Sequence, residues 1–312
     1  MKAVRYHSYG GPGVLAYEDA ERPAAGAGQV VVKVAGAAFN PVDGAIRAGF
    51  LQQVFPVTLP HIPGFDVAGV ITETGAGVSG WRPGDSVVAF LPMTAPGAAA
   101  EYAAVPAAAL AAAPRAADLA DAAALPSAGL TARQSLFEHA GLRAGQSILV
   151  NGAGGAVGGY AVQLAAQAGA AVTATASPRS AGRVRSYGAD RVIDYTAAPL
   201  PAAAAGQRFD VVLNLVATTP EETAALAGLT AGHGAFVSTT TPGPDDAGRG
   251  VRTVRVFARS DAAQLAELVA RVDAGDLKID VAQRRPLADL AAVHELAAAG
   301  RLPGKTVLIP DL

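Results

Sequence analysis

Residues 150–180 read VNGAGGAVGGYAVQLAAQAGAAVTATASPRS, and five glycines lie between positions 152 and 159. The apolar run QSILV precedes them, and an alanine-rich pattern with helical spacing follows. Glycines at such a point allow a tight turn from a strand into a helix, and they let backbone N–H groups approach a pyrophosphate. The stretch therefore predicts a strand, a glycine turn and a helix that together bind a dinucleotide.

The glycine spacing departs from the plain G-x-G-x-x-G pattern. It reads G-x-G-G-x-x-G, with G-x-x-G-x-x-G embedded at Gly152, Gly155 and Gly158. A turn that only lets the helix pack closely on a strand would look the same, so the motif alone is weak. Its place between a strand and a helix favours a binding site, and we expect the dinucleotide to contact Gly152, Ala153, Gly154, Gly155, Ala156, Val157 and Gly158.

The end of the next strand bears on which dinucleotide binds. An NAD site usually places an acidic residue about 20 positions after the glycines, where it binds the ribose hydroxyls. Here the segment is ASPRS and contains no acid. Ser177, Arg179 and Ser180 offer hydroxyls and a guanidinium that suit the 2′-phosphate of NADPH. We predict NADPH as the cofactor, and the open alternative is an ordinary surface arginine after a strand.

The rest of the chain shows two different sequence patterns. From Met1 to about Pro106, short β-rich runs are cut by Gly and Pro, which suggests a β-rich domain. After an Ala/Pro-rich stretch, strands alternate with helices, which implies a parallel sheet with helices on both faces. We expect an α/β protein with one domain at residues 1–120, completed by 257–312, and a doubly wound nucleotide-binding domain at 121–256.

Composition excludes several classes of function. The formal net charge is −2, which lacks the excess of positive charge typical of nucleic-acid binders. The chain has no cysteine, which excludes disulfides, thiol catalysis and thiolate zinc sites. Its N-terminus has no apolar signal, and its apolar stretches are interrupted before membrane-spanning length. We expect a cytoplasmic protein that acts on a small molecule, without a nucleic-acid or membrane partner.

Several segments in order resemble one known family across essentially the whole chain. They are KAVRYHSYGGPGVL, AAFNPVDGAIRAG, PHIPGFDVAGVI, ALPSAGLTA, NGAGGAVG and the closing GKTVLIP. Together they are similar to the medium-chain dehydrogenase/reductase superfamily, and within it to the zinc-independent, zeta-crystallin-like quinone oxidoreductases. The resemblance implies an N-terminal GroES-like catalytic domain and a Rossmann nucleotide-binding domain. No tyrosine is followed by lysine four positions later, which disfavours the short-chain reductases.

The chain departs from the zinc-dependent members of that superfamily at their metal ligands. Those members carry a catalytic Cys where this chain has Asn40, and Gly-His-Glu where it has Gly64, Phe65 and Asp66. They also have a structural loop with four cysteines, of which this chain has none. We therefore expect no metal, and hydride transfer from nicotinamide to an electron-poor acceptor such as a quinone or an α,β-unsaturated carbonyl.

The resemblance also implies the residues of the site. Asn40 corresponds to an amide near the acceptor that could donate to an oxyanion, and the open alternative is an Asn-Pro turn. Asp43, assigned to the catalytic pair with Asn40, could instead anchor a loop. Phe50 and Phe55 are expected to bind the acceptor. For the cofactor, the resemblance implies contacts with Thr131 and Tyr195. Ser127, a hydroxyl near Thr131, has a weaker claim to such a contact.

Two further sets of residues complete the expected cofactor site. Val216, Ala217 and Ser238 lie at the carboxyl ends of predicted parallel strands, where such sheets bind ligands. Lys305 is assigned to the cofactor as well, with a surface ion pair as its alternative. A homodimer is expected from relatives, with VRTVRVFA as a possible edge strand.

Two other functions stay open at this point. One is an enoyl reductase that tailors a polyketide or another secondary metabolite. The segment RAGFLQQVFP lacks the tyrosine that related enoyl reductases place there, which counts against this reading. The other is an NADPH-binding regulatory protein with little turnover.

Overall fold

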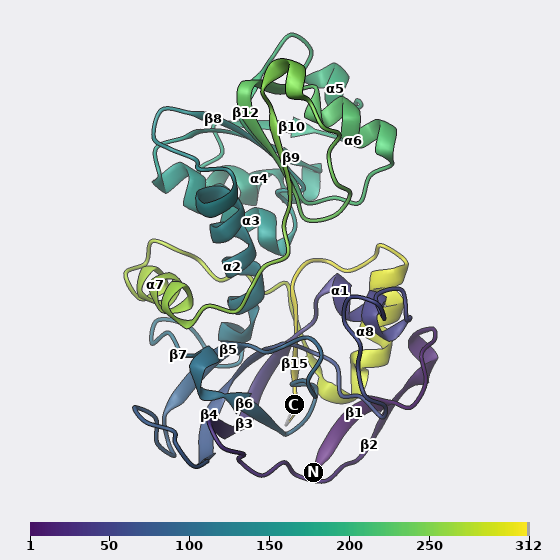
Figure 1. Ribbon diagram of the computed structural model, residues 1–312, viewed down its shortest axis with the longest axis vertical. Helices are drawn as coiled ribbons and strands as arrows, with labels where there is room; N and C mark the ends of the chain where they lie inside the picture. Colours follow the sequence, from purple (N-terminus) through teal and green to yellow (C-terminus); the bar gives the residue numbers. More distant parts are fainter. Residues whose placement is uncertain (311–312) are drawn as a thin grey trace. The chain divides into compact units, whose positions relative to one another are not determined.

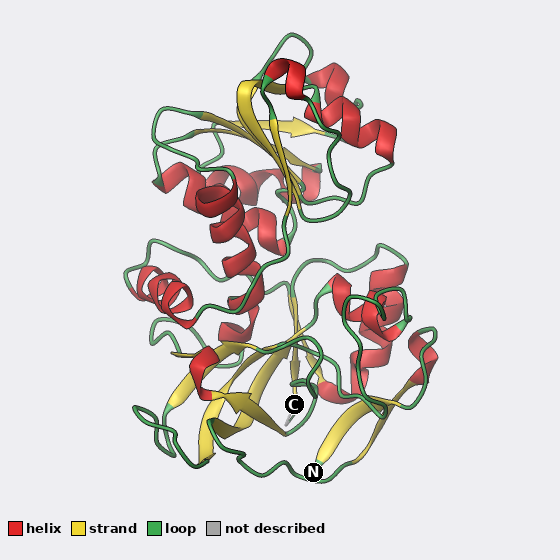
Figure 2. Cartoon of the chain, in the orientation of Figure 1, coloured by secondary structure: helices red, strands yellow, loops and turns green. Residues whose placement is uncertain are grey.

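Contacts between residues divide the chain into two units in the computed structural model, which describes residues 1–310. Figure 2 shows the helices and strands of the chain in different colours. Unit 1 comprises Met1–Ser127 and the segment from Ser260 onward, and unit 2 comprises Ala128–Arg259. The sequence-based bounds, after 120 and after 256, stay a prediction, and the contacts divide the chain after Ser127 and after Arg259.

Unit 2 is built on parallel strands, which confirms the prediction made from strands that alternate with helices along the sequence. Their bounds are β8 (Ser147–Asn151), β9 (Ala171–Ala176), β10 (Arg191–Asp194), β11 (Phe209–Asn214), β12 (Thr230–Ser238) and β13 (Arg252–Arg255). The order in the sheet is β10-β9-β8-β11-β12-β13, and every neighbouring pair is parallel. The order reverses between β8 and β11, which is where doubly wound sheets bind ligands.

Helices connect these strands on both faces of the sheet. Their bounds are α2 (Pro126–Arg133), followed by the π-helical turn η4 (Gln134–His139), then α3 (Ala156–Gln167), α4 (Pro178–Ser186), α5 (Leu200–Ala203) and α6 (Pro220–Ala227), with a 3-10 turn at η5 (Ala247–Arg249). In Figure 1, α3 and α4 lie on one side of the sheet and α5 and α6 on the other. Residues 126–139 are thus helical throughout, as α2 and η4.

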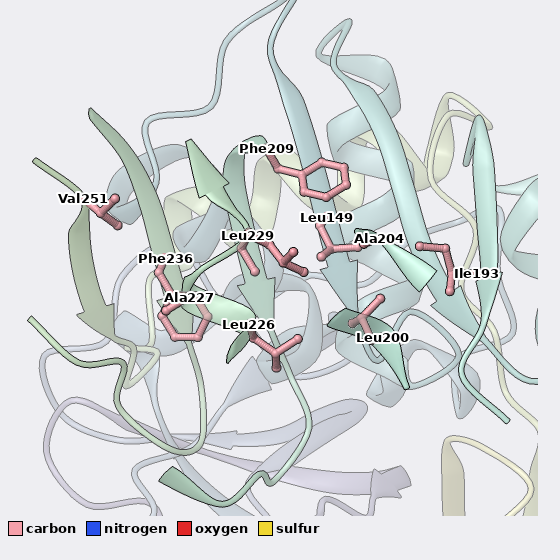
Figure 3. Packing of buried hydrophobic residues seen from close by; sticks show 11 residues of the cluster. Leu149, Ile193, Leu200, Ala204, Phe209, Leu226, Ala227, Leu229, Phe236 and Val251 are labelled. Atoms are coloured by element: carbon pink, nitrogen blue, oxygen red, sulfur yellow. The ribbon is translucent and has the colours of Figure 1, made fainter. Parts of the chain in front are cut away.

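The apolar face under α5 and α6 forms a buried core that holds unit 2 together (Figure 3). Burying a Val, Leu or Phe side chain contributes about 1.5–3 kcal/mol, so this cluster is a large stabilising term. Its members come from four strands, both helices and the segments beside them: Leu149, Ile193, Leu200, Ala204, Phe209, Val212, Leu226, Ala227, Leu229, Phe236 and Val251.

Unit 1 contains a larger mixed sheet and a separate two-stranded ribbon. The ribbon pairs β1 (Lys2–Tyr6) with β2 (Leu15–Asp19). The sheet contains β3 (Gln29–Ala38), β4 (Asp66–Thr74), β5 (Ser86–Phe90), β6 (Tyr102–Pro106), β7 (Leu110–Ala112), β14 (Gln283–Pro286) and β15 (Thr306–Ile309). Its order is β14-β15-β3-β4-β5-β7, and β6 also pairs with β3. The C-terminal strands thus complete the N-terminal sheet.

The helices of unit 1 are α1 (Pro41–Arg47), α7 (Ala262–Asp273) and α8 (Leu290–Ala298), with 3-10 turns at η1 (Pro12–Val14), η2 (Ala107–Ala109), η3 (Asp121–Ala124) and η6 (Leu287–Asp289). In α7 the buried residues Leu265, Leu268, Val269 and Val272 repeat at helical spacing, and the Asp261 carboxylate caps the first turn by accepting from the Gln264 N–H at 3.0 Å. Within residues 1–310, no helix has the length and apolar character needed to cross a membrane.

Strand register brings three distant segments to one end of the unit 1 sheet. Ala38, the last residue of β3, pairs with Asp66, the first residue of β4. On the other side of β3, Ala38 pairs with Val307 of β15, and the Phe39 N–H donates to the Thr306 carbonyl at 3.0 Å. Asn40, Asp66 and Lys305 therefore lie at or beside neighbouring strand ends, although they are far apart in sequence.

Candidate functional site

The glycine turn of unit 2 has the shape that a dinucleotide needs. Gly152 has φ +95°, a conformation that favours glycine. A Cβ on Gly158 would lie 2.3 Å from the Gly152 carbonyl oxygen, so α3 packs against the turn only because position 158 has no side chain. A Cβ on Gly155 would meet only the Gly152 oxygen, at 3.5 Å. The turn is therefore tight on its inner side and open at Gly155, which caps α3 without a side chain.

A polar network supports the turn where the strand order reverses. The Asn151 Nδ2 at the end of β8 donates to the Asn214 Oδ1 at the end of β11, over 2.9 Å. Thr175 in β9 donates to the Asn151 Oδ1 at 3.0 Å and accepts from the Gly152 N–H at 2.9 Å. Since these side chains are buried, the network fixes the first residue of the turn.

The predicted residues at the ends of β11 and β12 join the same network. The Asn214 Nδ2 donates to the Val216 carbonyl at 3.0 Å and lies 3.4 Å from the buried Ser238 hydroxyl. Val216 is exposed, and its side chain is the nearest group that a Cβ on Gly152 would meet. Ala217, the next residue, is also exposed. The carboxyl edge of the sheet thus carries an apolar rim beside the glycine turn.

The start of α4 lies against the second glycine. Ser177 precedes the helix, Arg179 is exposed in its first turn, and Ser180 is buried. A Cβ on Gly154 would lie 2.7 Å from the Ser180 hydroxyl oxygen, so the two segments touch. One turn later, the Arg183 guanidinium donates to the Gly154 carbonyl at 2.8 Å. The start of α4 therefore places arginine and serine side chains beside the glycine turn.

Two other predicted cofactor residues take different places in unit 2. Tyr195 directly follows β10, two strands from β8, and is 54% exposed. Thr131 lies in α2 and is half-buried. Both stay predictions.

Unit 1 holds a buried polar cluster at the meeting strand ends, which we call the Asp66 cluster: Asn40, Asp66, Ser127 and Lys305. Asp66 has no exposed surface, and its carboxylate accepts from the Ser127 N–H at 2.7 Å and from the Ser127 hydroxyl at 2.6 Å. It also accepts from the Asn40 Nδ2 at 2.9 Å and lies 3.3 Å from the Lys305 Nζ. The Lys305 Nζ donates to the Asn40 Oδ1 at 2.7 Å. The ion pair of Lys305 is therefore buried, not a surface pair.

Asp43 lies beside this cluster and anchors the start of α1. Its Oδ2 accepts from the Asn40 N–H at 2.9 Å, and its Oδ1 accepts from the Gly64 N–H at 3.3 Å. Burial, and to a smaller extent the nearby Asp66 carboxylate, raise the pKa of Asp43 from its ordinary value to about 7. The Asn40 N–H bond and the Lys305 charge act in the opposite direction. Asp43 thus both anchors the loop and titrates near neutral pH.

More buried polar groups lie behind Asp43. Burial lowers the pKa of His61 to about 4 and that of His294 to about 3, so both rings are neutral at pH 7. Within residues 1–310, the Tyr6 hydroxyl, both His294 ring nitrogens, and the Arg47 Nε and Nη1 have no hydrogen-bond partner. Two cavities of about 10 Å³, both lined by Asp43, Pro63 and Gly64, are each about the size of one water molecule. They are far too small for an organic acceptor.

The two predicted aromatic residues lie on the segment after α1. Phe50 is 85% exposed and Phe55 is half-buried. Their part in binding the acceptor stays a prediction.

Comparison with known proteins identifies the family. The family model "Alcohol dehydrogenase GroES-like domain" matches residues 26–115, and "Zinc-binding dehydrogenase" matches residues 187–308. The chloroplast envelope quinone oxidoreductase homolog of Arabidopsis thaliana is 33% identical over 225 residues, which cover 69% of this chain and 68% of that protein. The chain belongs to the quinone oxidoreductases of the medium-chain dehydrogenase/reductase superfamily. The solved quinone oxidoreductase from Coxiella burnetii superposes with a TM-score of 0.89 and 29% identity, covering 99% of both chains.

A third relative has a different named activity. The chloroplastic NADPH-dependent alkenal/one oxidoreductase of Arabidopsis thaliana is 37% identical over 205 residues, which cover 63% of this chain and 53% of that protein. The GroES-like match lies within unit 1, and the parallel sheet of unit 2 is the Rossmann part of this oxidoreductase. The predicted fold and family are both confirmed.

The chain does not carry the donor set that a zinc-binding relative needs. It has no cysteine, and residues 1–310 bring together no group of three or more His, Asp or Glu side chains that could hold a metal. At the positions where the zinc-dependent members bind metal, this quinone oxidoreductase has an amide, Asn40, and a carboxylate, Asp66, that are bonded to Lys305.

Sequence reasoning missed part of each half of the site. In unit 2 it missed Asn151, Thr175 and Asn214, although an Asn that ends an apolar run, as in ILVN and VVLN, was a visible signal. In unit 1 it used Asp66 only as a departure from a metal motif. The link between Asp66 and Lys305 had no local signal, because the two residues lie 239 positions apart.

The raised pKa of Asp43 makes the stability of this unit depend on pH. The folded pKa of about 7 lies above the ordinary value of 3.8, so the unfolded chain loses this proton first as pH rises. The contribution of Asp43 is therefore fully present below about pH 4 and is lost between pH 4 and pH 7. We expect the free energy of unfolding of Asp43→Asn to rise relative to wild type over this range, with a slope of up to about 1.4 kcal/mol per pH unit.

Chemical denaturation of both proteins at several pH values between 4 and 8 measures this difference. The histidines are present in both proteins, so their titration cancels. A difference that does not change with pH would show that Asp43 does not titrate in this range.

Proposed function

We propose that this chain is an NADPH-dependent, zinc-independent oxidoreductase that transfers hydride to a quinone or an α,β-unsaturated carbonyl. The observation that carries the proposal is the open glycine turn at the point where the strand order reverses, next to Ser177, Arg179 and Ser180. The names of the relatives, quinone oxidoreductases and an NADPH-dependent alkenal/one oxidoreductase, support the acceptor class.

Unit 2 would hold the cofactor through the glycine turn. The open face at Gly155 leaves the first N–H groups of α3 for the pyrophosphate, and the helix dipole favours the negative charge there. The buried amides of Asn151 and Asn214 keep the turn in place during binding. The cofactor supplies hydride from its nicotinamide ring, and the side chains of the chain orient it and exclude water.

The choice of NADPH rests on the end of β9. No carboxylate follows this strand, so nothing there would repel a 2′-phosphate or bind ribose hydroxyls in its place. Arg179 is exposed in the first turn of α4, and its guanidinium can bind a phosphate with two charge-assisted hydrogen bonds. The neighbouring hydroxyls of Ser177 and Ser180 add donors of the kind that a phosphate accepts.

A conjugated acceptor suits the groups that unit 1 provides. Conjugation spreads the electron pair that arrives with hydride toward an oxygen, so a strong acid or a metal is less necessary than for a saturated ketone. The cluster around Asp66 offers an amide and an ammonium, and the exposed Phe50 offers an aromatic surface. We propose that Asn40, Asp43, Phe50 and Phe55 form the acceptor side of the site.

Initial rates of NADPH and NADH oxidation, followed by absorbance against quinones, enones and enoyl thioesters, test this function. We expect turnover with NADPH and either quinones or enones. Turnover with enoyl thioesters alone would instead indicate an enoyl reductase. NADPH binding without turnover on any acceptor would indicate a regulatory protein.

Substitution of Arg179 tests the choice of cofactor. We expect Arg179→Ala to weaken NADPH binding by about tenfold to a hundredfold, the equivalent of one or two charge-assisted hydrogen bonds, and to leave NADH binding nearly unchanged. Arg185→Ala removes an exposed arginine of the same charge from the other end of α4 and serves as the control. Equal weakening of both cofactors would show that Arg179 does not contact the 2′-phosphate.

We also propose that the protein is a homodimer. The supporting observation is that β13 forms an end of the unit 2 sheet, where its unpaired backbone groups can accept another strand. Light scattering at micromolar concentration should give twice the 31.0 kDa mass of the chain. A mass of one chain would contradict the proposal.

A further inference from the structure

The hydrogen bonds of the Asp66 cluster show which of its groups can donate to an acceptor. Asn40 has two amide hydrogens, and the Nδ2 that carries them lies 2.9 Å from the Asp66 Oδ2 and 3.2 Å from the Ala38 carbonyl oxygen. Both acceptors belong to unit 1. A hydrogen bond from Asn40 to a substrate would therefore have to replace one of these two bonds.

Lys305, unlike Asn40, has more donor hydrogens than acceptors within unit 1. An ammonium carries three hydrogens, and the Lys305 Nζ has two acceptors, the Asn40 Oδ1 at 2.7 Å and the Asp66 Oδ2 at 3.3 Å. Within residues 1–310, its third hydrogen has no recorded acceptor. Lys305 is therefore the group in the cluster that can donate one more hydrogen bond.

The ammonium is held in a fixed position. The Lys305 side chain is 3% exposed, and Val307, two residues later, pairs with Ala38 in the sheet. The Asn40 Oδ1 and the Asp66 carboxylate then hold the end of the chain from two directions. A charge fixed in this way needs little reorganisation when a negative charge forms beside it.

The buried ion pair of Lys305 and Asp66 is only weakly explained by a contribution to the stability of the fold. Burying an ion pair removes both charges from water, and well-packed apolar residues of similar size often stabilise a protein as much or more. The Asp66 carboxylate also has three neutral donor groups, two on Ser127 and one on Asn40, so it is well hydrogen-bonded without the ammonium. Hydrogen bonding of the carboxylate therefore does not by itself require the lysine.

We propose that Lys305, and not Asn40, stabilises the oxygen that becomes negative when the acceptor is reduced. This inference rests on the proposed function. Hydride adds to one end of the conjugated acceptor, and the displaced π electron pair moves to the oxygen. Lys305 donates a hydrogen bond to that oxygen through its third hydrogen and transfers no proton. A proton from water completes the product. Asn40 and Asp66 act as positioning residues for the ammonium.

Replacing the ammonium by an apolar side chain tests the proposal. We expect Lys305→Met to lower kcat for an enone by about a hundredfold to a thousandfold, the loss typical of one oxyanion donor. The loss should be smaller for an electron-poor quinone, because that acceptor stabilises its own negative charge. The dissociation constant of NADPH, measured by fluorescence titration without an acceptor, should stay unchanged. Lys2→Met, which removes an exposed ion pair with Asp19, is the matched control and should leave both readouts unchanged.

A second variant separates catalysis from folding. Lys305→Met leaves the Asp66 charge buried without its cation and could lower Tm for that reason alone. The double variant Lys305→Met/Asp66→Asn removes both charges and should recover much of that Tm. A kcat that stays low in a double variant with recovered Tm supports the proposal. Recovery of kcat together with Tm overturns it, since the lysine would then be only structural.

The remaining outcomes are also decisive. Equal losses for enone and quinone in a stable variant, or weaker NADPH binding with unchanged kcat, overturn the proposal in favour of a general or cofactor-binding role. Failure of the proposed function looks different, because the wild-type protein would then bind NADPH and reduce no acceptor at all.

Discussion

The complete burial of the Asp66 carboxylate constrains the rest of unit 1. A charged group without exposed surface must find its hydrogen bonds inside the protein, or its burial costs several kcal/mol. Asp66 finds them on three segments that the sequence keeps far apart: the second residue after β3, the start of α2 and the residue before β15. The strand register and the cluster therefore specify each other, since a shift of β15 by one residue would move Lys305 away from the carboxylate.

Unit 2 depends on a constraint of another kind, the distance between backbones. Its glycine turn is narrow where α3 approaches at Gly158 and open where a ligand would lie at Gly155. Parallel strands bring their carboxyl ends to one edge, so the polar residues that end β8, β9 and β11 meet behind that turn without any local sequence relation. The fold thus brings these polar residues together at one edge of the sheet.

These two constraints explain how much the sequence could predict. The glycine turn, the alternating strands and the helices of unit 2 follow from local patterns, because each strand, turn or helix has its signal within about ten residues. The helix α1 was not expected, and a turn was the open alternative for Asn-Pro, although Asp43 three residues after Asn40 is a signal for a helix start. The Lys305 contact with Asn40 spans 265 positions, and only the pairing of β15 with β3 creates it. No local pattern can report such a contact.

The Asp66 cluster also shows the limit of assigning roles by resemblance. Resemblance placed Asn40 near the acceptor and Lys305 near the cofactor, because it aligns positions and carries no information about hydrogen bonds. In this chain both hydrogens of the Asn40 amide face acceptors of unit 1, and its oxygen accepts from Lys305. A relative with the same amide and no lysine would leave that oxygen without this donor, and the amide could then turn and donate elsewhere. The role of the amide therefore depends on the residue before β15, and the two positions have to be interpreted together.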